Sequence, residues 1–220
     1  MTRRMIAPLL FGLVGVAILL SLGAWQLRRL EWKTAILGEI EARLAAEPVP
    51  VPAAPDPVAD RYRRVRAEGT LLPGELHVYT AGPDGKVGYR VIAPMALPDG
   101  RRILLDRGFV PIAAKNAPRP PGTIAVTGNL VWPQEGPARP DLEANIWIAR
   151  DVPLMAEALG TEPAMVVAAE SAPADGPTPL PVTVAIPNDH LSYAITWFGL
   201  AVVWTLMTVY LLWRIKRRTD

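Results

Sequence analysis

The stretch Ile6–Leu27, IAPLLFGLVGVAILLSLGAWQL, is a run of 22 residues without a charged side chain. As a helix rising about 1.5 Å per residue, a run of this length crosses the hydrocarbon core of a bilayer, which is roughly 30 Å thick. A cleavable signal peptide has a shorter apolar region of about 7–15 residues and a small-residue cleavage site. This run ends instead in Trp25-Gln26-Leu27. The stretch therefore predicts a first transmembrane helix at 6–27.

A second uncharged run lies near the other end of the chain. Leu191–Trp213, LSYAITWFGLAVVWTLMTVYLLW, has 23 residues, and four Lys and Arg side chains follow it. Two arginines also precede the first run. Because Lys and Arg are retained on the cytoplasmic side, we expect short cytoplasmic tails at 1–5 and 214–220. The second transmembrane helix is predicted at 188–213, and the domain between the two helices is expected on the periplasmic side of a bacterial inner membrane.

Charge and composition exclude several functional classes. The formal net charge is only +2, which gives no sign of a nucleic-acid partner. The chain has no Cys, so disulfides, thiolate metal sites, Cys nucleophiles and covalent c-type haem attachment are excluded. Only two histidines, His77 and His190, are available as metal ligands or as bases near neutral pH.

The segment between the two runs divides into three parts. Apolar residues continue at steps of three and four after Arg28, which predicts a helix extension at 28–47. Five prolines then predict an extended Pro-rich tether at 48–60. The segment 61–187 is predicted to be a periplasmic, β-rich domain, an antiparallel sheet or small barrel with one short helix that starts at Asp151 and ends at Gly160. Its short apolar runs, each bounded by turn residues, are Tyr62–Val65, Leu76–Val78, Tyr89–Ile92, Ile103–Leu105, Ile124–Val126, Ile146–Ile148, Met165–Val167 and Val182–Val184. The predicted fold class is thus a membrane protein with two transmembrane helices flanking a mainly antiparallel α+β domain.

The common catalytic motifs are missing from the sequence. There are three serines and no G-x-S-x-G elbow, no H-E-x-x-H zinc motif, and no glycine-rich loop followed by a helix that would hold a phosphate. A membrane-tethered hydrolase is therefore a weak hypothesis, and we expect a protein that is not an enzyme.

His190 is the residue that most suggests a ligand. It lies in the first turn of the second predicted span, and Tyr193 and Trp197 follow it at helical spacing. Aromatic and small residues alternate down this helix, which predicts a groove for a large apolar ligand. The alternative is that these side chains are simple interfacial anchors.

The end of the first span contributes a possible rim to the same site. Trp25, Arg28 and Arg29 lie at the same membrane boundary as His190 if the helices pack together. An aromatic, His-bearing cleft with a basic rim suits a porphyrin-like ligand whose carboxylates reach Arg. Ordinary flanking charge remains the alternative for each arginine. His77 lies in an alternating strand pattern and is interpreted as structural or surface-exposed.

The segment Asn188–Leu200, NDHLSYAITWFGL, resembles the N-x-H-L-x-Y-A-x-T-W-[FY]-G-L signature of the surfeit locus protein family. Further similar blocks occur in the same order: Gly23–Arg29 with Trp32-Lys33, Tyr62–Val65 with Gly69, Gly88-Tyr89, Ile103–Pro111, Asn145–Trp147 and Arg150-Asp151. The segment Pro173–Pro177 departs from the fuller loop of many relatives.

The resemblance implies an assembly factor for aa-type cytochrome c oxidase that binds haem a and assists its delivery to subunit I. His190 is then the axial haem-iron ligand, with Tyr193, Trp197, Trp25 and Arg28 as further cofactor contacts. The implied partners are oxidase subunit I, haem a synthase and membrane lipid. The block Asp106–Phe109 is a family landmark without an assigned ligand, for which a turn or packing role is expected. The alternative function is a cofactor-free scaffold that stabilises oxidase assembly intermediates.

Overall fold

The computed structural model describes residues 3–133, 135, 140–172, 176–184 and 187–218. The chain forms two compact units, Met1–Glu39 with Val184–Asp220, and Ile40–Thr183. Each unit is described by itself below. The expected tails and the loop at 173–177 lie partly outside the described residues.

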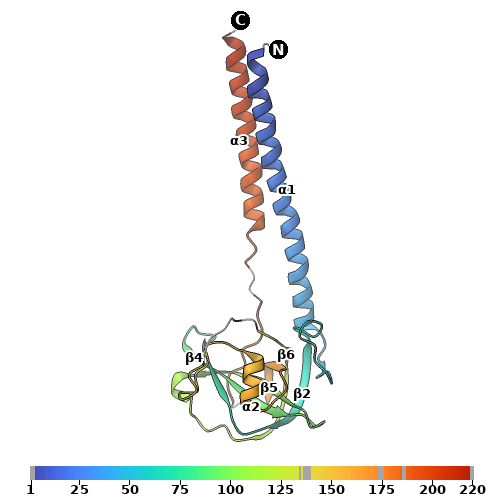
Figure 1. Ribbon diagram of the computed structural model, residues 1–220, viewed down its shortest axis with the longest axis vertical. Helices are drawn as coiled ribbons and strands as arrows, with labels where there is room; N and C mark the ends of the chain where they lie inside the picture. Colours follow the sequence, from blue (N-terminus) through green and yellow to red (C-terminus); the bar gives the residue numbers. More distant parts are fainter. Residues whose placement is uncertain (1–2, 134, 136–139, 173–175, 185–186, 219–220) are drawn as a thin grey trace. The chain divides into compact units, whose positions relative to one another are not determined.

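The first unit is a pair of long helices, α1 (Arg3–Ala45, whose last residues belong to the second unit) and α3 (His190–Arg217). Both are long and apolar enough to cross a membrane. The helix extension is confirmed, since α1 continues well past Leu27. The two helices lie side by side and antiparallel, with both ends of the chain at the same end of the pair (Figure 1).

Glycines on α1 allow the two helices to approach closely. A Cβ atom at Gly12 would lie 2.2 Å from Thr208, and one at Gly15 would lie 2.3 Å from the indole nitrogen of Trp204. Trp204 Nε1 donates to the carbonyl oxygen of Gly12 at 3.2 Å. Nearer the other end, Gly23 faces the ring of Phe198. When small residues lie opposite large ones, van der Waals packing can hold apolar helices together without the hydrophobic effect.

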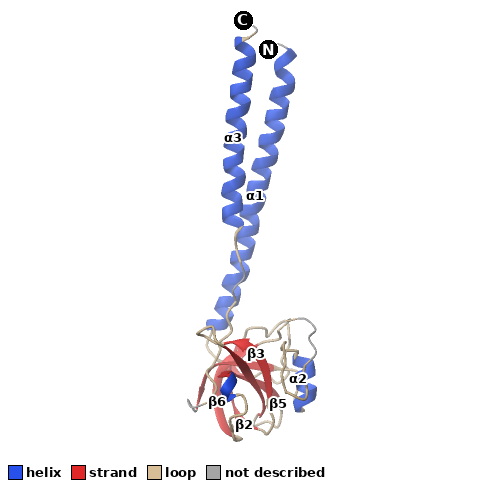
Figure 2. Ribbon diagram, turned by 90° about the vertical axis from the view of Figure 1, so that its left-hand side faces the viewer, coloured by secondary structure: helices blue, strands red, loops and turns tan. Residues whose placement is uncertain are grey.

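The second unit is a mixed β-sheet with one short helix (Figure 2). Its elements are β1 (Val49–Pro50), β2 (Arg64–Leu71), β3 (Leu76–Ala81), β4 (Val87–Ala96), β5 (Arg102–Pro111), the 3₁₀ turn η1 (Ile112–Ala114), β6 (Gly122–Leu130), α2 (Val152–Leu159) and β7 (Met165–Ala172). The strand order is β1-β2-β6-β7-β5-β4-β3. Because β2 also pairs with β4, through Thr70–Ala96 and Leu71–Met95, five of the strands form a closed ring. The sheet is therefore a small barrel, with β1 and β3 added outside the ring.

The prediction of mainly antiparallel pairing holds for most neighbours but not for all of them. The pairs β1–β2 and β5–β7 are parallel. The long connection from β6 to β7 contains α2, so β7 is inserted between β6 and β5. The insertion of a late strand between earlier ones cannot be read from strand patterns along the chain.

Buried apolar side chains form two large clusters on opposite faces of the barrel wall and a small third one of Tyr89, Val91 and Val110. One cluster includes Val65, Met95, Ile103 and Leu105, which come from several strands of the ring. The other packs α2 and Trp147 onto the outer face of the strands, with Met155 fully buried. Period-two alternation along each strand separates the two sets.

The predicted short helix is confirmed together with both of its ends. The side chain of Asp151 accepts a hydrogen bond from the Leu154 N–H at 3.1 Å, and Pro153 lies in the first turn. Gly160 ends the helix with φ of 64°, and its N–H donates back to helix carbonyls. These are the usual capping roles of Asp and Gly.

The Pro-rich segment 48–60 is not a free spacer, and this part of the prediction is wrong. Val49 and Pro50 pair with Val65 and Arg66 of β2. Val51 packs against the same core cluster, and Arg101 Nη1 donates to the carbonyl of Pro52 at 2.7 Å. Valines between the prolines supply apolar surface, and proline is tolerated at the edge of a sheet, so the segment forms part of the domain.

Three predicted strand runs differ from the structure. In the run 62–65 the strand begins only at Arg64, because Tyr62 has φ of 66°. The run 146–148 makes only isolated bridges, since Asn145, with φ of 50°, turns the chain immediately before it. The run 182–184 is not a strand, and prolines at 179 and 181 remove two backbone donors there.

Candidate functional site

His190 is the first residue of α3, as the sequence predicts. Asp189 occupies the N-cap position without a side-chain capping bond, and its carbonyl oxygen accepts from the N–H of Tyr193 at 3.2 Å. The imidazole lies against α1, where its Nδ1 is 2.7 Å from Oε1 of Gln26. Gln26 is only 9% exposed. A part-buried side-chain hydrogen bond thus joins the two helices at this level.

This hydrogen bond selects one tautomer of His190. An amide oxygen only accepts, so Nδ1 carries the proton and the lone pair of the neutral ring is on Nε2. Histidines that bind metals usually donate their other ring N–H to a fixed acceptor, which orients the ring and makes it more basic. Gln26 provides such an acceptor. The arrangement suits coordination of a metal by Nε2.

Gln26 was missed when the sequence was considered alone. It is the only amide side chain in the uncharged run 6–27, and it lies one turn after Gly23, where the ring of Phe198 packs closely. An isolated amide in an apolar run is costly unless it is hydrogen-bonded. That cost was the available signal that Gln26 would have a partner on another helix.

The other predicted site residues differ in their exposure. Tyr193 is 56% exposed and Trp25 is 49% exposed, while Arg28 is exposed and Trp197 is half-buried. Among the residues that the structure describes, none of these four makes a hydrogen bond or a ring contact with His190. Arg29 lies over the indole of Trp32, 4.6 Å from the ring centre. The joint rim and cleft around a ligand stays a prediction.

The predicted groove along α3 is largely filled by α1. Ala194 and Ala201 are 1% and 3% exposed. Trp204 packs against Phe11, with 5.3 Å between ring centres, and over Gly15. The alternation of small and aromatic residues therefore serves helix pairing along this part of α3. The ligand-binding role of His190, in the first turn of α3, stays a prediction.

Two further polar groups lie just before α3: the carbonyl group of Pro187 and the side chain of Asn188. Lys33 Nζ donates to the carbonyl oxygen of Pro187, which attaches the start of α3 to α1. Oδ1 of Asn188 is buried and has no hydrogen-bond partner within the described part of the chain. A buried acceptor without a partner is unusual in folded proteins, and this one lies two residues from His190.

These residues fit a haem more closely than a polydentate metal site. In the described ranges, no group of three or more His, Asp or Glu side chains is placed to hold a metal ion. A haem needs only an axial ligand from the protein, and His190 is available for that role. The chemistry of the donor set is therefore compatible with the predicted cofactor.

The block Asp106–Phe109 is explained by packing in the barrel. Asp106 is fully buried and its Oδ2 accepts from Arg90 Nη1 at 2.8 Å, with Arg150 Nη1 3.7 Å away. Its Oδ1 accepts from the N–H of Gly108 at 3.0 Å. Gly108 has φ of 106°, and Phe109 packs over the glycines at 82 and 88. The expected turn and packing role is correct for Asp106, Gly108 and Phe109.

His77 is 4% exposed and belongs to a buried polar network. Its Nε2 is 3.0 Å from Glu75 Oε1, and its Nδ1 is 3.2 Å from Asn145 Nδ2. Arg119 Nε donates to Glu75 Oε2 at 2.9 Å. Burial by itself raises the pKa of Glu75, but the bonds from His77 and Arg119 outweigh it and lower the pKa to about 2. The structural interpretation of His77 therefore holds, and the surface alternative does not.

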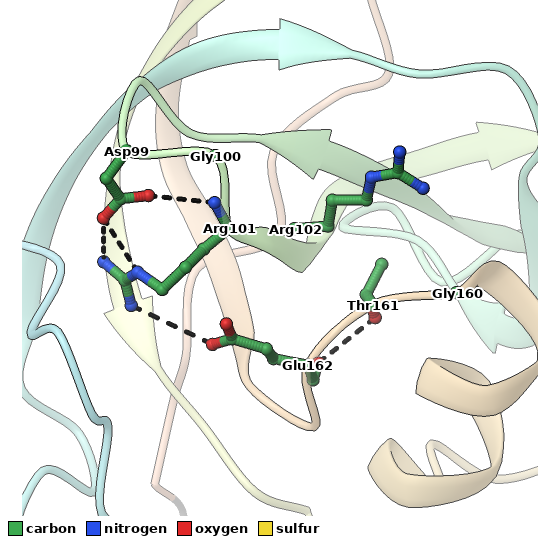
Figure 3. Close-up of a pocket in the computed structure, with 7 residues that line it drawn as sticks. All are labelled: Asp99, Gly100, Arg101, Arg102, Gly160, Thr161 and Glu162. Atoms are coloured by element: carbon green, nitrogen blue, oxygen red, sulfur yellow. Dashed lines mark hydrogen bonds and ion pairs between the residues drawn. The ribbon is translucent and has the colours of Figure 1, made fainter.

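An open hollow of about 540 Å³ lies near the turn between β4 and β5 (Figure 3). Its charged side chains largely neutralise one another: Arg101 Nη2 is 2.7 Å from Asp99, and Arg101 Nη1 is 3.9 Å from Glu162. Arg101 also holds the Pro-rich segment through Pro52. Arg102 lines the hollow as well but is exposed, so the ion pairs of Arg101 give most of this hollow a structural explanation.

The fold defines a class of protein: two helices that are long and apolar enough to cross a membrane share a His–Gln hydrogen bond and flank a small mixed barrel in the sequence. Comparison with known proteins gives the family. The model of the SURF1 family matches residues 13–202, and the chain belongs to this family.

Relatives occur in animals and bacteria. The chain is 31% identical to surfeit locus protein 1 of Xenopus tropicalis, over 85% of this chain and 70% of that protein. It is 32% identical to surfeit locus protein 1 of Homo sapiens, over 82% and 69% of the two chains. A SURF1-like protein of Rickettsia felis is 29% identical over 92% and 94%. The similarity thus includes both helices and the barrel.

Proposed function

We propose that this protein is an assembly factor for aa-type cytochrome c oxidase, and that it binds haem a through Nε2 of His190. The observation that carries the proposal is the 2.7 Å hydrogen bond between His190 Nδ1 and Gln26, which leaves the lone pair of Nε2 available to bind a metal. Membership of the SURF1 family supports the link to oxidase assembly. The protein assists delivery of haem a to subunit I and is not itself an enzyme.

Each residue of this site has a definite task. His190 supplies an axial nitrogen, Gln26 fixes its tautomer and ring plane, and Lys33 holds the preceding backbone through Pro187. Haem a itself supplies the redox-active iron. A single protein ligand makes the cofactor easier to transfer than a ligand on each face would, which suits a carrier. Tyr193, Trp197, Trp25 and Arg28 are candidate outer contacts because they lie within two turns of His190 or Gln26.

The same proposal assigns a membrane location. The large apolar side chains of α1 and α3 are mostly exposed, as they are in helices that face lipid. The two arginines at the start of α1 and the basic last turn of α3 favour cytoplasmic termini, with the barrel in the periplasm. Subunit I, haem a synthase and membrane lipid are then the proposed partners.

The test is to purify the full chain in mild detergent from cells that make haem a, and to record its absorbance spectrum and haem content. We expect a bound haem a in the wild type and its loss in His190→Ala. His77→Gln is the matched control, because His77 is the other histidine and lies in the barrel. If His190→Ala retains full haem content and affinity, the ligand assignment is wrong.

A cofactor-free scaffold is the second candidate. Its support is that Tyr193, Trp25 and Arg28 are exposed and that, within the described part of the chain, their side chains make no hydrogen bond or ring contact with His190. In that case the wild type carries no haem from haem a-making cells but still co-purifies with oxidase subunits. The same preparation therefore separates the two functions.

A further inference from the structure

Arg107 is the one residue of the Asp106–Phe109 block that packing does not explain. Ile103 and Leu105 precede it on β5 and are fully buried in the core cluster inside the ring of strands. Side chains two apart on a strand lie on the same face. Arg107 therefore continues the inward-facing row of β5, and it also lines a gap beside Leu105, Ile124 and Val126.

Its guanidinium is only partly exposed and is not neutralised. Within the described part of the chain, Arg107 Nε is buried without a hydrogen-bond partner, and Arg107 forms no ion pair. The neighbouring Asp106 faces the opposite side of the strand and forms ion pairs with Arg90 and Arg150. A buried arginine without an anion is rare, because charged groups lose hydration on burial.

Arg107 borders a hollow of about 100 Å³ that it shares with Arg119 and Glu75. The remaining wall consists of the turn Leu71–Gly74 and of Ala93. Arg119 is fully engaged: besides the Glu75 carboxylate, it donates to the carbonyl oxygens of Ala114 and Lys115. One carboxylate therefore faces two guanidinium groups in this hollow.

Burial and the neighbouring charges both act on the pKa of Arg107. Burial lowers the pKa of its guanidinium, Glu75 opposes this effect, and the like charge of Arg119 adds to it. The group stays protonated, since arginine has so high an initial pKa. A second anion in the hollow would offset the loss of hydration that burial imposes on the charged guanidinium.

We propose that this hollow is a binding site for one oxyanion group, a carboxylate or a phosphate, with Arg107 as its principal donor. The planar guanidinium matches both groups through paired N–H donors. A volume of about 100 Å³ holds a few water molecules, or one such group, but not a porphyrin ring. The site is distinct from His190 and does not depend on haem binding.

The test uses the full chain in detergent, with inorganic phosphate and acetate as separate probes at constant ionic strength set with chloride. Binding stabilises the folded state, so we expect saturable slowing of hydrogen exchange in peptides covering 71–77 and 104–109. At a concentration ten times Kd, the Tm of the barrel should rise by roughly 3 °C. A third arm places the protein in nanodiscs of phosphatidylglycerol without added anion, to distinguish a lipid headgroup from a free anion.

Arg107→Gln should abolish the protection, whereas Arg107→Lys should retain it more weakly. Arg102→Gln is the matched control, because Arg102 is exposed at the start of the same strand and does not line the hollow. Exchange in β2 and β6 verifies that each variant is folded. Without anion, the Tm of Arg107→Gln should equal or exceed that of the wild type, since an unpaired charge is removed. Unchanged phosphate, acetate and lipid responses in Arg107→Gln, or no saturable response of the wild type in any arm, would overturn the proposal.

Discussion

The Nδ1 atom of His190 lies 2.7 Å from Oε1 of Gln26, a residue 164 positions earlier in the chain. The bond joins the first turn of α3 to α1 in a setting where few other polar side chains are buried. It makes the ring of His190 a fixed donor of one lone pair. The site therefore depends on the pairing of the helices as well as on the histidine.

Replacing Gln26 tests this dependence directly. In Gln26→Leu the imidazole loses its acceptor, so its tautomer and ring plane are no longer selected, and we expect haem affinity to fall by about 10–100-fold. Gln26→Glu keeps an acceptor oxygen and should retain more binding than Gln26→Leu. Haem titration followed by absorbance measures both variants. Ser21→Ala is the control, since Ser21 bonds only within α1. Wild-type affinity in Gln26→Leu would show that Gln26 has no positioning role.

Asp106 should be a major contributor to the stability of the barrel. Its fully buried carboxylate accepts from Arg90 and from Gly108, and Arg150 lies nearby. Asp106→Asn removes the charge that compensates two arginines, and breaking a buried ion pair costs about 3–5 kcal/mol. Hydrogen exchange of the β4 and β5 amides measures the loss. Asp84→Asn, which alters an exposed pair with Lys86, should leave these amides unchanged.

Gly108 is expected to tolerate no side chain. Its φ is 106°, and an added Cβ would lie 2.1 Å from the carbonyl oxygen of Thr178. Gly108→Ala therefore combines backbone strain with a clash against backbone, and we expect a loss of more than about 3 kcal/mol in the free energy of unfolding. Gly100→Ala is the control, because Gly100 also has positive φ, of 87°, but no atom within 4 Å of the added Cβ. It should cost only about 1–2 kcal/mol. Equal losses would mean that the contact with Thr178 is unimportant.

Glu75 should make the barrel sensitive to acid. Its pKa falls from the ordinary 4.5 to about 2 in the folded state, so the unfolded chain binds the proton more tightly. The stabilisation is fully present above pH 4.5 and is lost as the pH falls toward 2, by up to about 3 kcal/mol. Chemical unfolding between pH 6 and pH 2, followed by hydrogen exchange of β3 and β4, measures this change. Glu75→Gln should be less stable at pH 6 and should lose less stability on acidification. An identical pH profile in that variant would exclude Glu75 as the cause.

Local sequence signals predicted many elements correctly. The uncharged runs, the continuation of α1 past Leu27, the α2 caps at Asp151 and Gly160, and most of the strands depend on residues only a few positions apart. Signals failed where a distant partner decided the outcome. The Pro-rich segment pairs with Val65 and Arg66 of β2, which only the folded domain brings beside it. In the same way, the groove along α3 is filled by side chains packing against α1.

The candidate site divides in the same way. Two histidines in a chain without cysteine, one of them beginning an apolar helix, are enough to single out His190, because ligand chemistry and helix position are properties of short segments. Three other features join residues that are far apart in the chain: the bond to Gln26, the sharing of Asp106 between Arg90 and Arg150, and the closure of β2 onto β4. The missing partner of Arg107 Nε likewise depends on what surrounds it in the folded domain. Such contacts depend on how whole elements pack, since burial removes water from every polar group and makes its partner in space decisive.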